Sequence, residues 1–234
     1  MKNVGSVNLH FLNGFIKRPN MKILAIADLH NYITSCALST IEKTKYDFCV
    51  LLGDIGERAL SSLCSVLDLN KTYGILGNHD SFDLYQKFGI KELAFDNQVA
   101  PVSKYSSTTI KGLSGSVRYK QGDFPMLTQE ESIKLCTHEK GDCDIVFSHD
   151  FPYKFYGEKG IFYCSHIGLR GINNYLQNIN CPKLLVHGHY HRNTKTVYDR
   201  GVGYSQKSNP LVIGVYGCVL INYKTFTSKI LFQP

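Results

Sequence analysis

The stretch Met21-Lys22-Ile23-Leu24-Ala25-Ile26-Ala27-Asp28-Leu29-His30 decides the fold, because a short apolar run ends abruptly in an acid and a histidine. Similar runs recur along the chain, each bounded by Gly, Asp or Asn. Their apolar residues are mostly consecutive rather than alternate, which is typical of strands covered on both faces. The pattern therefore predicts strands at 23–27, 48–52, 73–76, 109–113, 145–147, 184–186, 211–215 and 219–222.

Amphipathic segments lie between several of these runs, with apolar residues three and four positions apart. This spacing predicts helices over 33–45, 59–70, 128–138 and 169–177. Strands and helices alternate in the first half, as in βαβ units, and the strand-rich second half predicts a second sheet. We expect an α/β fold with mixed sheets stacked between helices. Residues 1–20 are polar and irregular, so we predict an N-terminal extension followed by one domain over 21–234.

The composition restricts the class of protein. With 43% hydrophobic and 19% charged residues, the chain of 234 residues does not have the profile of a disordered protein. No apolar run approaches the roughly 20 residues that span a bilayer, so we expect no membrane partner. The net charge of +7 suits an anionic substrate. Because the basic residues are scattered without a dense block, nucleic acid is a less favoured partner.

The eight cysteines form no CxxC pair, and Cys49 and Cys218 lie within apolar runs. This pattern is typical of free thiols in a reducing compartment rather than of a disulfide framework. The N-terminus lacks the apolar stretch of a secretion signal. We therefore expect a cytoplasmic protein whose cysteines are neither catalytic nor disulfide-bonded.

Polar side chains follow five of the predicted strands at the point where each strand ends. Ligands of open α/β sheets gather at the carboxyl ends of strands, because the loops there converge. Any one of these residues alone could serve as a turn or helix N-cap residue, but five such ends together are hard to explain by packing. They carry Asp28 and His30; Asp54; Asn78, His79 and Asp80; His149 and Asp150; and His187, His189 and His191.

Carboxylate and imidazole groups together suit Mn, Fe or Zn, and the absence of cysteine at these ends argues against a structural zinc site. Two carboxylates, one amide and several histidines exceed what one ion needs and suit two. A carboxylate is the natural bridge between two divalent ions, since its charge offsets their repulsion. We therefore expect two divalent ions, with Mn favoured and Fe or Zn as alternatives.

The motifs as a set resemble those of the calcineurin-like metallophosphoesterases. The resemblance covers residues 21 to about 223, and the ordered set is far more specific than any one motif alone. The spacing agrees with it, with 26 residues from Asp28 to Asp54 and 25 from Asp54 to His79. The matching stretches are Asp28-Leu29-His30, Gly53-Asp54, Gly77-Asn78-His79-Asp80, His149 and Gly188-His189-Tyr190-His191.

This resemblance implies a four-layer α/β/β/α sandwich and a hydrolase of phosphoesters. It implies that Asp54 bridges the two ions and that a hydroxide between them attacks phosphorus. His79 would be a catalytic histidine that is not a ligand, protonating the leaving group, and Asp80 would orient it. The remaining implied ligands are Asp28, His30 and His191 for the first ion and Asn78, His149 and His189 for the second.

For other polar residues near the motifs, the sequence gives weaker indications of a role. His187 is expected to be a strand-end histidine bonded to backbone or to an acid, and Asp150 to support its loop. Candidate substrate-binding residues are Arg58, Arg118 and His166. The segments 109–116, 118–120 and 153–156 supply further candidates on the substrate side.

The substrate stays open at this point. A phosphodiesterase or phosphatase acting on a small nucleotide-like substrate is favoured. A protein Ser/Thr phosphatase is weighed against it, but Glu57, Ala59 and Asp80 depart from the motifs of that branch. A nuclease of the same superfamily usually has a large capping domain, for which the 43 residues after His191 leave little room. A non-catalytic scaffold with this fold would usually have lost several of the ligands.

Overall fold

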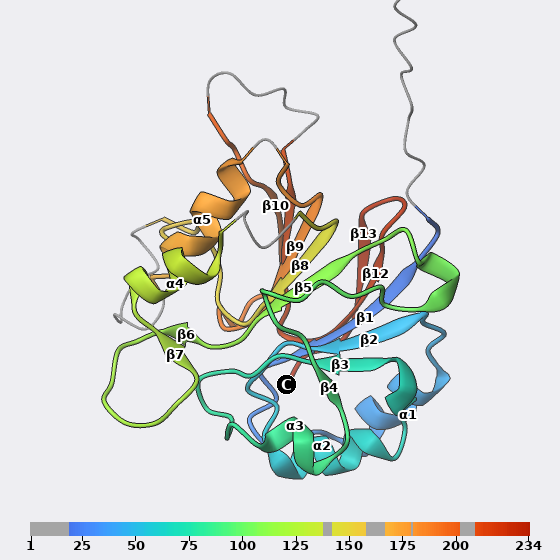
Figure 1. Ribbon diagram of the computed structural model, residues 1–234. Coiled ribbons are helices and arrows are strands. Elements are labelled where there is room, and N and C mark those ends of the chain that lie inside the picture. The colour runs from blue at the N-terminus through green and yellow to red at the C-terminus, as the bar shows by residue number, and fades with distance from the viewer. Residues whose placement is uncertain (1–18, 138–141, 158–166, 179, 202–208) are drawn as a thin grey trace, which may run out of the picture.

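The computed structural model describes residues 19–137, 142–157, 167–178, 180–201 and 209–234. Two β-sheets form its centre, and helices cover their outer faces (Figure 1). The first sheet has six strands, in the order β13 (Thr227–Phe232), β12 (Gly217–Asn222), β1 (Lys22–Ala27), β2 (Phe48–Leu51), β3 (Thr72–Gly74) and β4 (Lys91–Glu92). The second has five, in the order β10 (Thr194–Val197), β11 (Leu211–Gly214), β9 (Leu184–His187), β8 (Ile145–Ser148) and β5 (Ile110–Leu113).

Both sheets are mixed, as expected. Strands β1 to β4 run parallel, while β12 is antiparallel to β1, with Ile26 opposite Cys218. In the second sheet β5, β8, β9 and β11 are parallel and β10 is antiparallel. The last two strands of the chain thus return to the first sheet rather than extending the second. A short third pair joins β6 (Ser116–Val117) to β7 (Met126–Leu127).

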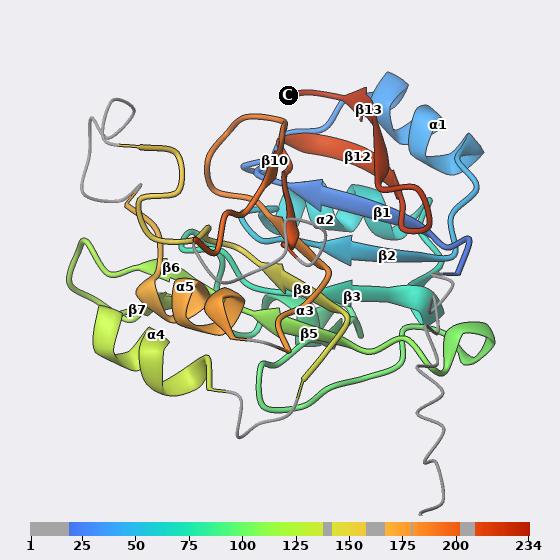
Figure 2. The same ribbon diagram turned by 90° about the horizontal axis from the view of Figure 1, so that it is seen from above.

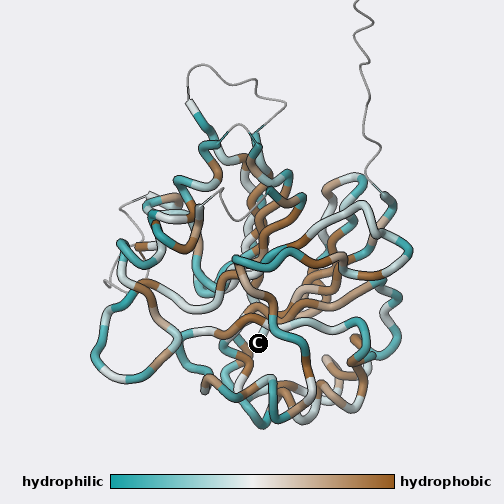
Figure 3. Tube along the Cα trace, in the orientation of Figure 1, coloured by the Kyte–Doolittle hydropathy of each residue, from teal (hydrophilic) through white to brown (hydrophobic). Residues whose placement is uncertain are grey.

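The uninterrupted apolar runs are explained by burial on both faces of each strand. In β1, Ile23 and Ala25 face the other sheet, whereas Leu24 and Ile26 face the helices. Because successive side chains of a strand point to opposite faces, a strand buried on both sides must be apolar throughout. Figure 3 shows the resulting hydrophobic colouring along the central strands.

Helices complete four layers. On one side α1 (Ser35–Lys43), α2 (Glu57–Cys64) and α3 (Leu84–Lys87) cover the first sheet, and on the other α4 (Gln129–Leu135) and α5 (Arg170–Gln177) cover the second (Figures 1 and 2). A capping box fixes the start of α4, because Thr128 accepts the Glu131 amide while the Glu131 carboxylate accepts the Thr128 amide. The expected α/β/β/α sandwich is therefore confirmed.

Several boundaries differ from the sequence prediction. The helix expected over 59–70 ends at Cys64, and a separate 3₁₀ turn, η1 (Leu69–Lys71), follows after an Asp68 cap. The edge strands β10 and β13 were not expected, because most of their residues are exposed and therefore polar or mixed. The seven cysteines among the described residues are free thiols. Within that same part of the chain, no helix has the length and apolarity needed to cross a membrane.

Burial between the sheets predicts that two isoleucines contribute very different amounts to the free energy of unfolding. Ile145 is fully buried between the sheets, and Ile230 on edge strand β13 is half exposed. Ile145→Ala should lower the free energy of unfolding by about 2–5 kcal/mol through lost burial and an unfilled cavity. Ile230→Ala should cost less than about 1 kcal/mol. Urea unfolding curves of both variants measure the difference, and equal losses would contradict the assigned core.

Candidate metal centre

The polar residues predicted from the sequence meet where the two sheets bring the carboxyl ends of their strands together. Figure 2 shows β1 and β2 running toward the side of the molecule where β6 and β7 lie. The loop after β9 crosses to the first sheet, where the His189 amide donates to the Asp28 carboxylate at 2.9 Å. The Gly188 amide donates to the His149 carbonyl at 3.0 Å. One continuous site thus receives residues from β1, β2, β3, β8 and β9.

The backbone at this site has an unusual conformation. Eight non-glycine residues in the described part of the chain have positive φ, and six of them lie here. Such left-handed conformations cost free energy for most side chains and cluster at functional sites, where the surrounding structure holds them. The surrounding structure therefore holds the backbone in the conformation that points these side chains into the site. The six are Asp28, His30, Asn31, Asp54, His189 and His191.

Two glycines allow the loops to approach closely. A Cβ on Gly77 would collide with the carboxylate and the backbone nitrogen of Asp54. A Cβ on Gly53 would lie 2.6 Å from Nδ1 of His149, and the φ of Gly53 is +90°. The glycines before Asp54 and Asn78 are thus explained by close packing of the site loops.

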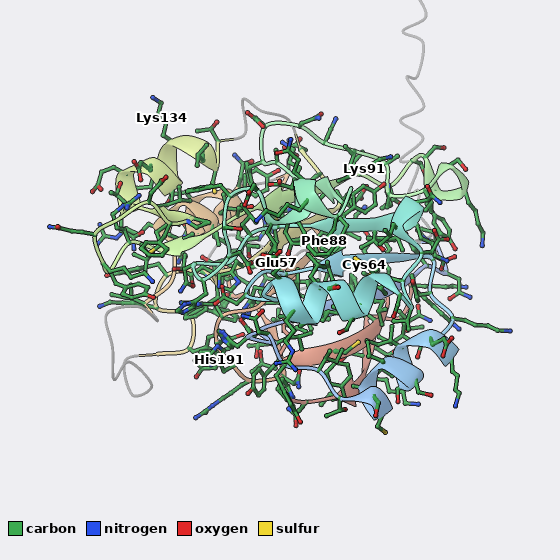
Figure 4. All side chains as sticks on the ribbon, turned by 90° about the horizontal axis from the view of Figure 1, so that it is seen from below. Glu57, Cys64, Phe88, Lys91, Lys134 and His191 are labelled. Atoms are coloured by element: carbon green, nitrogen blue, oxygen red, sulfur yellow. The ribbon has the colours of Figure 1, made fainter. Side chains whose placement is uncertain are left out.

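The first cluster contains Asp28, His30 and His191. One ligand atom from each lies within 4.8 Å of the others. Nε2 of His30 lies 3.3 Å from Nε2 of His191, which is 3.8 Å from the Asp28 carboxylate. The two imidazoles are exposed and the carboxylate is buried. Figure 4 shows His191 on the side of the molecule toward Glu57, the first residue of α2, and away from Cys64 at its end.

The second cluster contains Asp54, His149 and His189, all buried. Nδ1 of His149 donates to the Leu52 carbonyl at 2.8 Å, which turns Nε2 toward the cluster. That Nε2 lies 3.0 Å from Oδ1 of Asn78 and 3.5 Å from Oδ2 of Asp54. An imidazole nitrogen, an amide oxygen and a carboxylate oxygen therefore face one point. A proton or a cation at that point offsets the repulsion among these three electron-rich atoms.

The electrostatics of the metal-free site reflect this crowding of negative charge. Burial raises the pKa of Asp28 to about 8, and the charge of Asp54 reinforces the shift. Burial also raises the pKa of Asp80. For His149, burial acts to lower the pKa, but the carboxylates of Asp54 and Asp28 outweigh it, so the pKa is raised. The site thus favours positive charge, whether from protons or from cations.

Asp80 lies at the centre of the loops rather than against the ring of His79. Its Oδ2 accepts the amides of Asp54 and Gly77, each at 2.8 Å, and its Oδ1 accepts the Gly56 amide at 3.3 Å. These bonds tie the loops after β2 and β3 together. The expected orienting contact between Asp80 and the His79 imidazole is not among the contacts of the described residues. His79 is exposed, with its ring 5.4 Å from that of His30.

The candidate substrate-binding residues have different surroundings. Arg58 is exposed near the start of α2, and its amide donates to Oδ1 of Asn31 at 3.0 Å. The Arg118 guanidinium donates to the carbonyls of Met126 and Gly122, so it holds its own loop. Its neighbour Tyr119 reaches the site instead, because its hydroxyl accepts Nδ2 of Asn78 at 3.1 Å. His166 lies outside the described residues.

His187 and Asp150 make the loop-supporting contacts that their sequence context predicts. Nδ1 of His187 donates to the Gly188 carbonyl at 2.8 Å, and Nε2 accepts the Tyr156 hydroxyl at 2.7 Å. Burial lowers the pKa of His187 to about 4, so the ring is neutral. The Asp150 carboxylate accepts the amides of Val117 and Phe151 at 2.9 and 2.8 Å. Both residues hold loops that carry other residues of the site.

A small hollow opens over the centre, with a volume of about 240 Å³. Asn31 lines it and was missed by the sequence analysis. Its side chain packs against Gly56, where a Cβ would collide with it. Only its position directly after His30 could have drawn attention to it. The other lining residues are His30, Asp54, Gly56, His79 and Asp80.

The raised pKa of Asp28 predicts how the stability of the metal-free protein depends on pH. The unfolded chain releases this proton near pH 3.8, whereas the folded chain holds it to about pH 8. Between these values the folded state binds more protons, so stability should fall as pH rises, by at most about 1.4 kcal/mol per pH unit. Asp28→Asn should flatten this decline, as measured by urea unfolding between pH 5 and pH 8. An unchanged slope would contradict the burial of Asp28.

Comparisons with known proteins identify the fold and, separately, the family. No curated protein matches the chain significantly. Solved structures share the fold at low identity. TT1561 of Thermus thermophilus superposes with a TM-score of 0.58 at 12% identity, over 90% of this chain and 98% of that one. A dimetal phosphatase from Danio rerio gives 0.54 at 12% identity, over 88% and 93%.

The phosphopantetheinyl hydrolase of Mycobacterium tuberculosis gives a TM-score of 0.52 at 13% identity, over 83% of this chain and 89% of that one. At such identities these neighbours show the fold alone. The family itself is shown by a sequence model, described as calcineurin-like phosphoesterase, that matches residues 21–193. Because this match spans well over half of the chain and ends beyond His191, the protein belongs to the calcineurin-like phosphoesterase family.

Proposed function

We propose that this protein is a metal-dependent phosphoesterase that acts on a small, nucleotide-like phosphoester. The observation that carries the proposal is the pair of adjacent ligand clusters, Asp28–His30–His191 and Asp54–His149–His189. Either cluster alone would serve a single ion. Two clusters in one site are the arrangement that hydrolysis assisted by two metal ions requires.

The residues present fit two divalent ions. Asp28, His30 and His191 would hold the first ion, and His149, His189 and Asn78 the second, with Asp54 shared between them. These nitrogen and oxygen donors suit Mn, with Fe or Zn as alternatives. When bound, the ions would polarise phosphoryl oxygens and activate a water as the nucleophile.

The chain itself supplies the remaining steps. Two divalent ions against the carboxylates of Asp28 and Asp54 leave the centre formally positive, which favours a phosphate group. His79 is not part of either cluster, and its backbone amide donates to Asp54 at 2.8 Å. This bond fixes the position of His79 at the rim of the hollow, where its exposed imidazole can protonate the leaving oxygen. A positioned general acid contributes about 10²–10⁴-fold.

Asp80 has a supporting role in this proposal. By accepting the amides of Asp54, Gly56 and Gly77 it sets the distance between the loop with Asp54 and the loop with Asn78. Asp80→Asn would replace one acceptor oxygen by a donor and weaken both metal binding and turnover. Orientation of His79 would then be an indirect effect of the loop position.

A hydrolysis screen with Mn tests the activity and its substrate class. It compares mono- and bis-p-nitrophenyl phosphate, cyclic nucleotides, dinucleotides, a phosphoserine peptide, DNA and RNA. We expect turnover of small esters that chelation abolishes. Preference for the phosphopeptide would favour a protein phosphatase, and preference for DNA or RNA a nuclease. If the metal-loaded protein hydrolyses none of these esters, the result would favour a non-catalytic scaffold.

The shared role of Asp54 predicts the metal content of a variant. Wild-type protein loaded with Mn and desalted should retain two ions per chain by elemental analysis. Asp54→Asn should retain fewer and lose activity, because it removes charge beside both ions at once. The control Asp68→Asn changes an exposed carboxylate at the start of η1 and should retain both. A fully active wild type with one ion or fewer would contradict the dinuclear proposal.

The proposed role of His79 predicts a separation between binding and chemistry. His79→Ala should retain two ions while kcat falls by roughly 10²–10⁴. The loss should shrink for esters with acidic leaving groups such as p-nitrophenolate, which depart without a proton. His30→Ala, which changes an imidazole of the first cluster, should instead lose metal and recover partly with excess Mn. If His79→Ala behaves like His30→Ala, then His79 is a ligand.

A further inference from the structure

A second, larger cavity lies beside the metal centre, which we name the side groove. Its volume is about 460 Å³, within the roughly 300–1,000 Å³ of small-molecule sites. Leu76, Leu93, Phe95 and Met126 are buried and contribute to its lining. The hollow over the centre, at about 240 Å³, has none of these apolar side chains.

The loop after β3 contributes residues both to the side groove and to the centre. Leu76 and Phe82, at the two ends of residues 76–82, line the groove, and the same loop carries Asn78, His79 and Asp80. The groove therefore borders the loop that carries His79. In the proposed reaction His79 protonates the leaving oxygen, so the leaving group is the part of the substrate expected beside this loop.

Two hydrogen bonds tie the end of β5, which lines the groove, to the strand ends that carry the site residues. The His149 amide donates to the carbonyl of Leu113 at 3.1 Å. The Leu76 amide donates to Oγ of Ser114 at 2.9 Å. Leu113 and Ser114 both line the groove. The loop that begins at Arg118 forms another wall and returns to the centre through Tyr119, whose hydroxyl contacts Asn78.

The rim of the groove offers aromatic faces. Phe82 is 52% exposed and Phe124 is 36% exposed, and both line the groove. Lys120 Nζ lies 3.9 Å from the centre of the Phe124 ring, which holds that ring by a cation–π contact. Exposed aromatic rings above an apolar floor suit a planar ring, because offset stacking adds about 0.5–1.5 kcal/mol to the burial of its surface.

The charge of the rim restricts which ring fits. Glu92, Asp96 and Asp123 line the groove and are exposed. The guanidinium of Arg118, the one basic side chain among the lining residues that the structure describes, donates to the carbonyls of Met126 and Gly122. The three carboxylates outnumber the two nearby cations, Arg118 and the Lys120 ammonium beside Phe124. They repel an anionic group and accept hydrogen bonds from amino groups. This local charge is opposite to the net charge of +7 of the whole chain.

We propose that the side groove binds the leaving group of the substrate, and that this group carries an uncharged, planar aromatic ring, as a nucleoside or a phenol does. The proposal rests on the phosphoesterase activity proposed above and adds the substrate class. An anionic leaving group, such as a polyphosphate or a second nucleic-acid strand segment, is disfavoured by the rim. The ring occupies the groove while its phosphoester oxygen faces His79.

The first test compares an aryl and an alkyl phosphodiester whose leaving groups have matched pKa values. Wild type should prefer the aryl ester. Phe82→Ala should lower kcat/KM for the aryl ester by about tenfold, mostly through KM, and leave the alkyl ester and the metal content unchanged. Phe124→Ala should act likewise, and Phe82→Leu should restore part of the loss. Val197→Ala, at an exposed apolar residue on β10, is the matched control. Equal losses for both esters would overturn the proposal.

The second test concerns charge. A 4-carboxyphenyl ester should be a poorer substrate than a phenyl ester, because its carboxylate meets the acidic rim. Asp96→Asn combined with Asp123→Asn should raise kcat/KM for the 4-carboxyphenyl ester several-fold and leave the phenyl ester unchanged. A variant that treats both esters as the wild type does would show that these carboxylates do not face the ring.

The third test separates this proposal from the phosphoesterase activity itself. Adenosine has an aromatic ring and no phosphate, so its binding to the metal-free protein reports the groove alone. Calorimetry should detect binding that Phe82→Ala weakens about tenfold and Asp54→Asn leaves unchanged. Such binding without turnover of any ester would support the groove and refute the activity. Turnover with equal rates for aryl and alkyl esters and without adenosine binding would refute the groove alone.

Discussion

One hydrogen bond across the molecule sets the geometry of the site. The Asp28 carboxylate, at the end of β1, accepts the amide of His189, at the end of β9, and so ties the first sheet to the second. The two strands belong to different sheets, which face each other mainly through apolar side chains. Near the site the sheets are also joined by Nδ1 of His149, which donates to the Leu52 carbonyl. Because the bond between Asp28 and His189 joins side chain to backbone, it sets the distance between the two groups of ligands.

The same site concentrates features that would destabilise a protein elsewhere. Buried carboxylates with raised pKa values lie beside imidazoles, and six side chains project from left-handed backbone. The large apolar core between the sheets stabilises the fold enough to hold them. Cations placed among these ligands would offset the repulsion, so metal binding and folding stability are coupled.

The sequence predicts the fold best where a strand is buried on both faces, because only apolar residues fit there. Strands such as β1, β2 and β9 are apolar on both faces, and the polar residues that follow them therefore stand out. The edge strands β10 and β13 gave no such signal, since exposure allows almost any residue. Contacts between loops that are distant in the sequence could not be predicted from it either. Nothing in the sequence indicates that Asp80 accepts three amides, or that Tyr119 rather than Arg118 reaches Asn78.

The metal centre and the side groove divide recognition between two kinds of chemistry. In the proposed mechanism the metal-loaded centre would bind the phosphate group, while the groove would offer apolar surface and carboxylates to a neutral ring. Residues 76–82 belong to both, because they carry Asn78 and His79 between Leu76 and Phe82. A substrate that fills both would bring its leaving oxygen near His79, and in this proposal specificity and catalysis depend on one loop.

In the proposed mechanism two ions share one site through Asp54. Electron paramagnetic resonance of the Mn-loaded protein tests it most directly, because two Mn ions bridged by a carboxylate couple magnetically. We expect the spectrum of a coupled pair in the wild type, and either the spectrum of isolated ions or no spectrum of bound Mn in Asp54→Asn. A wild-type spectrum of isolated, uncoupled Mn at full loading would contradict it.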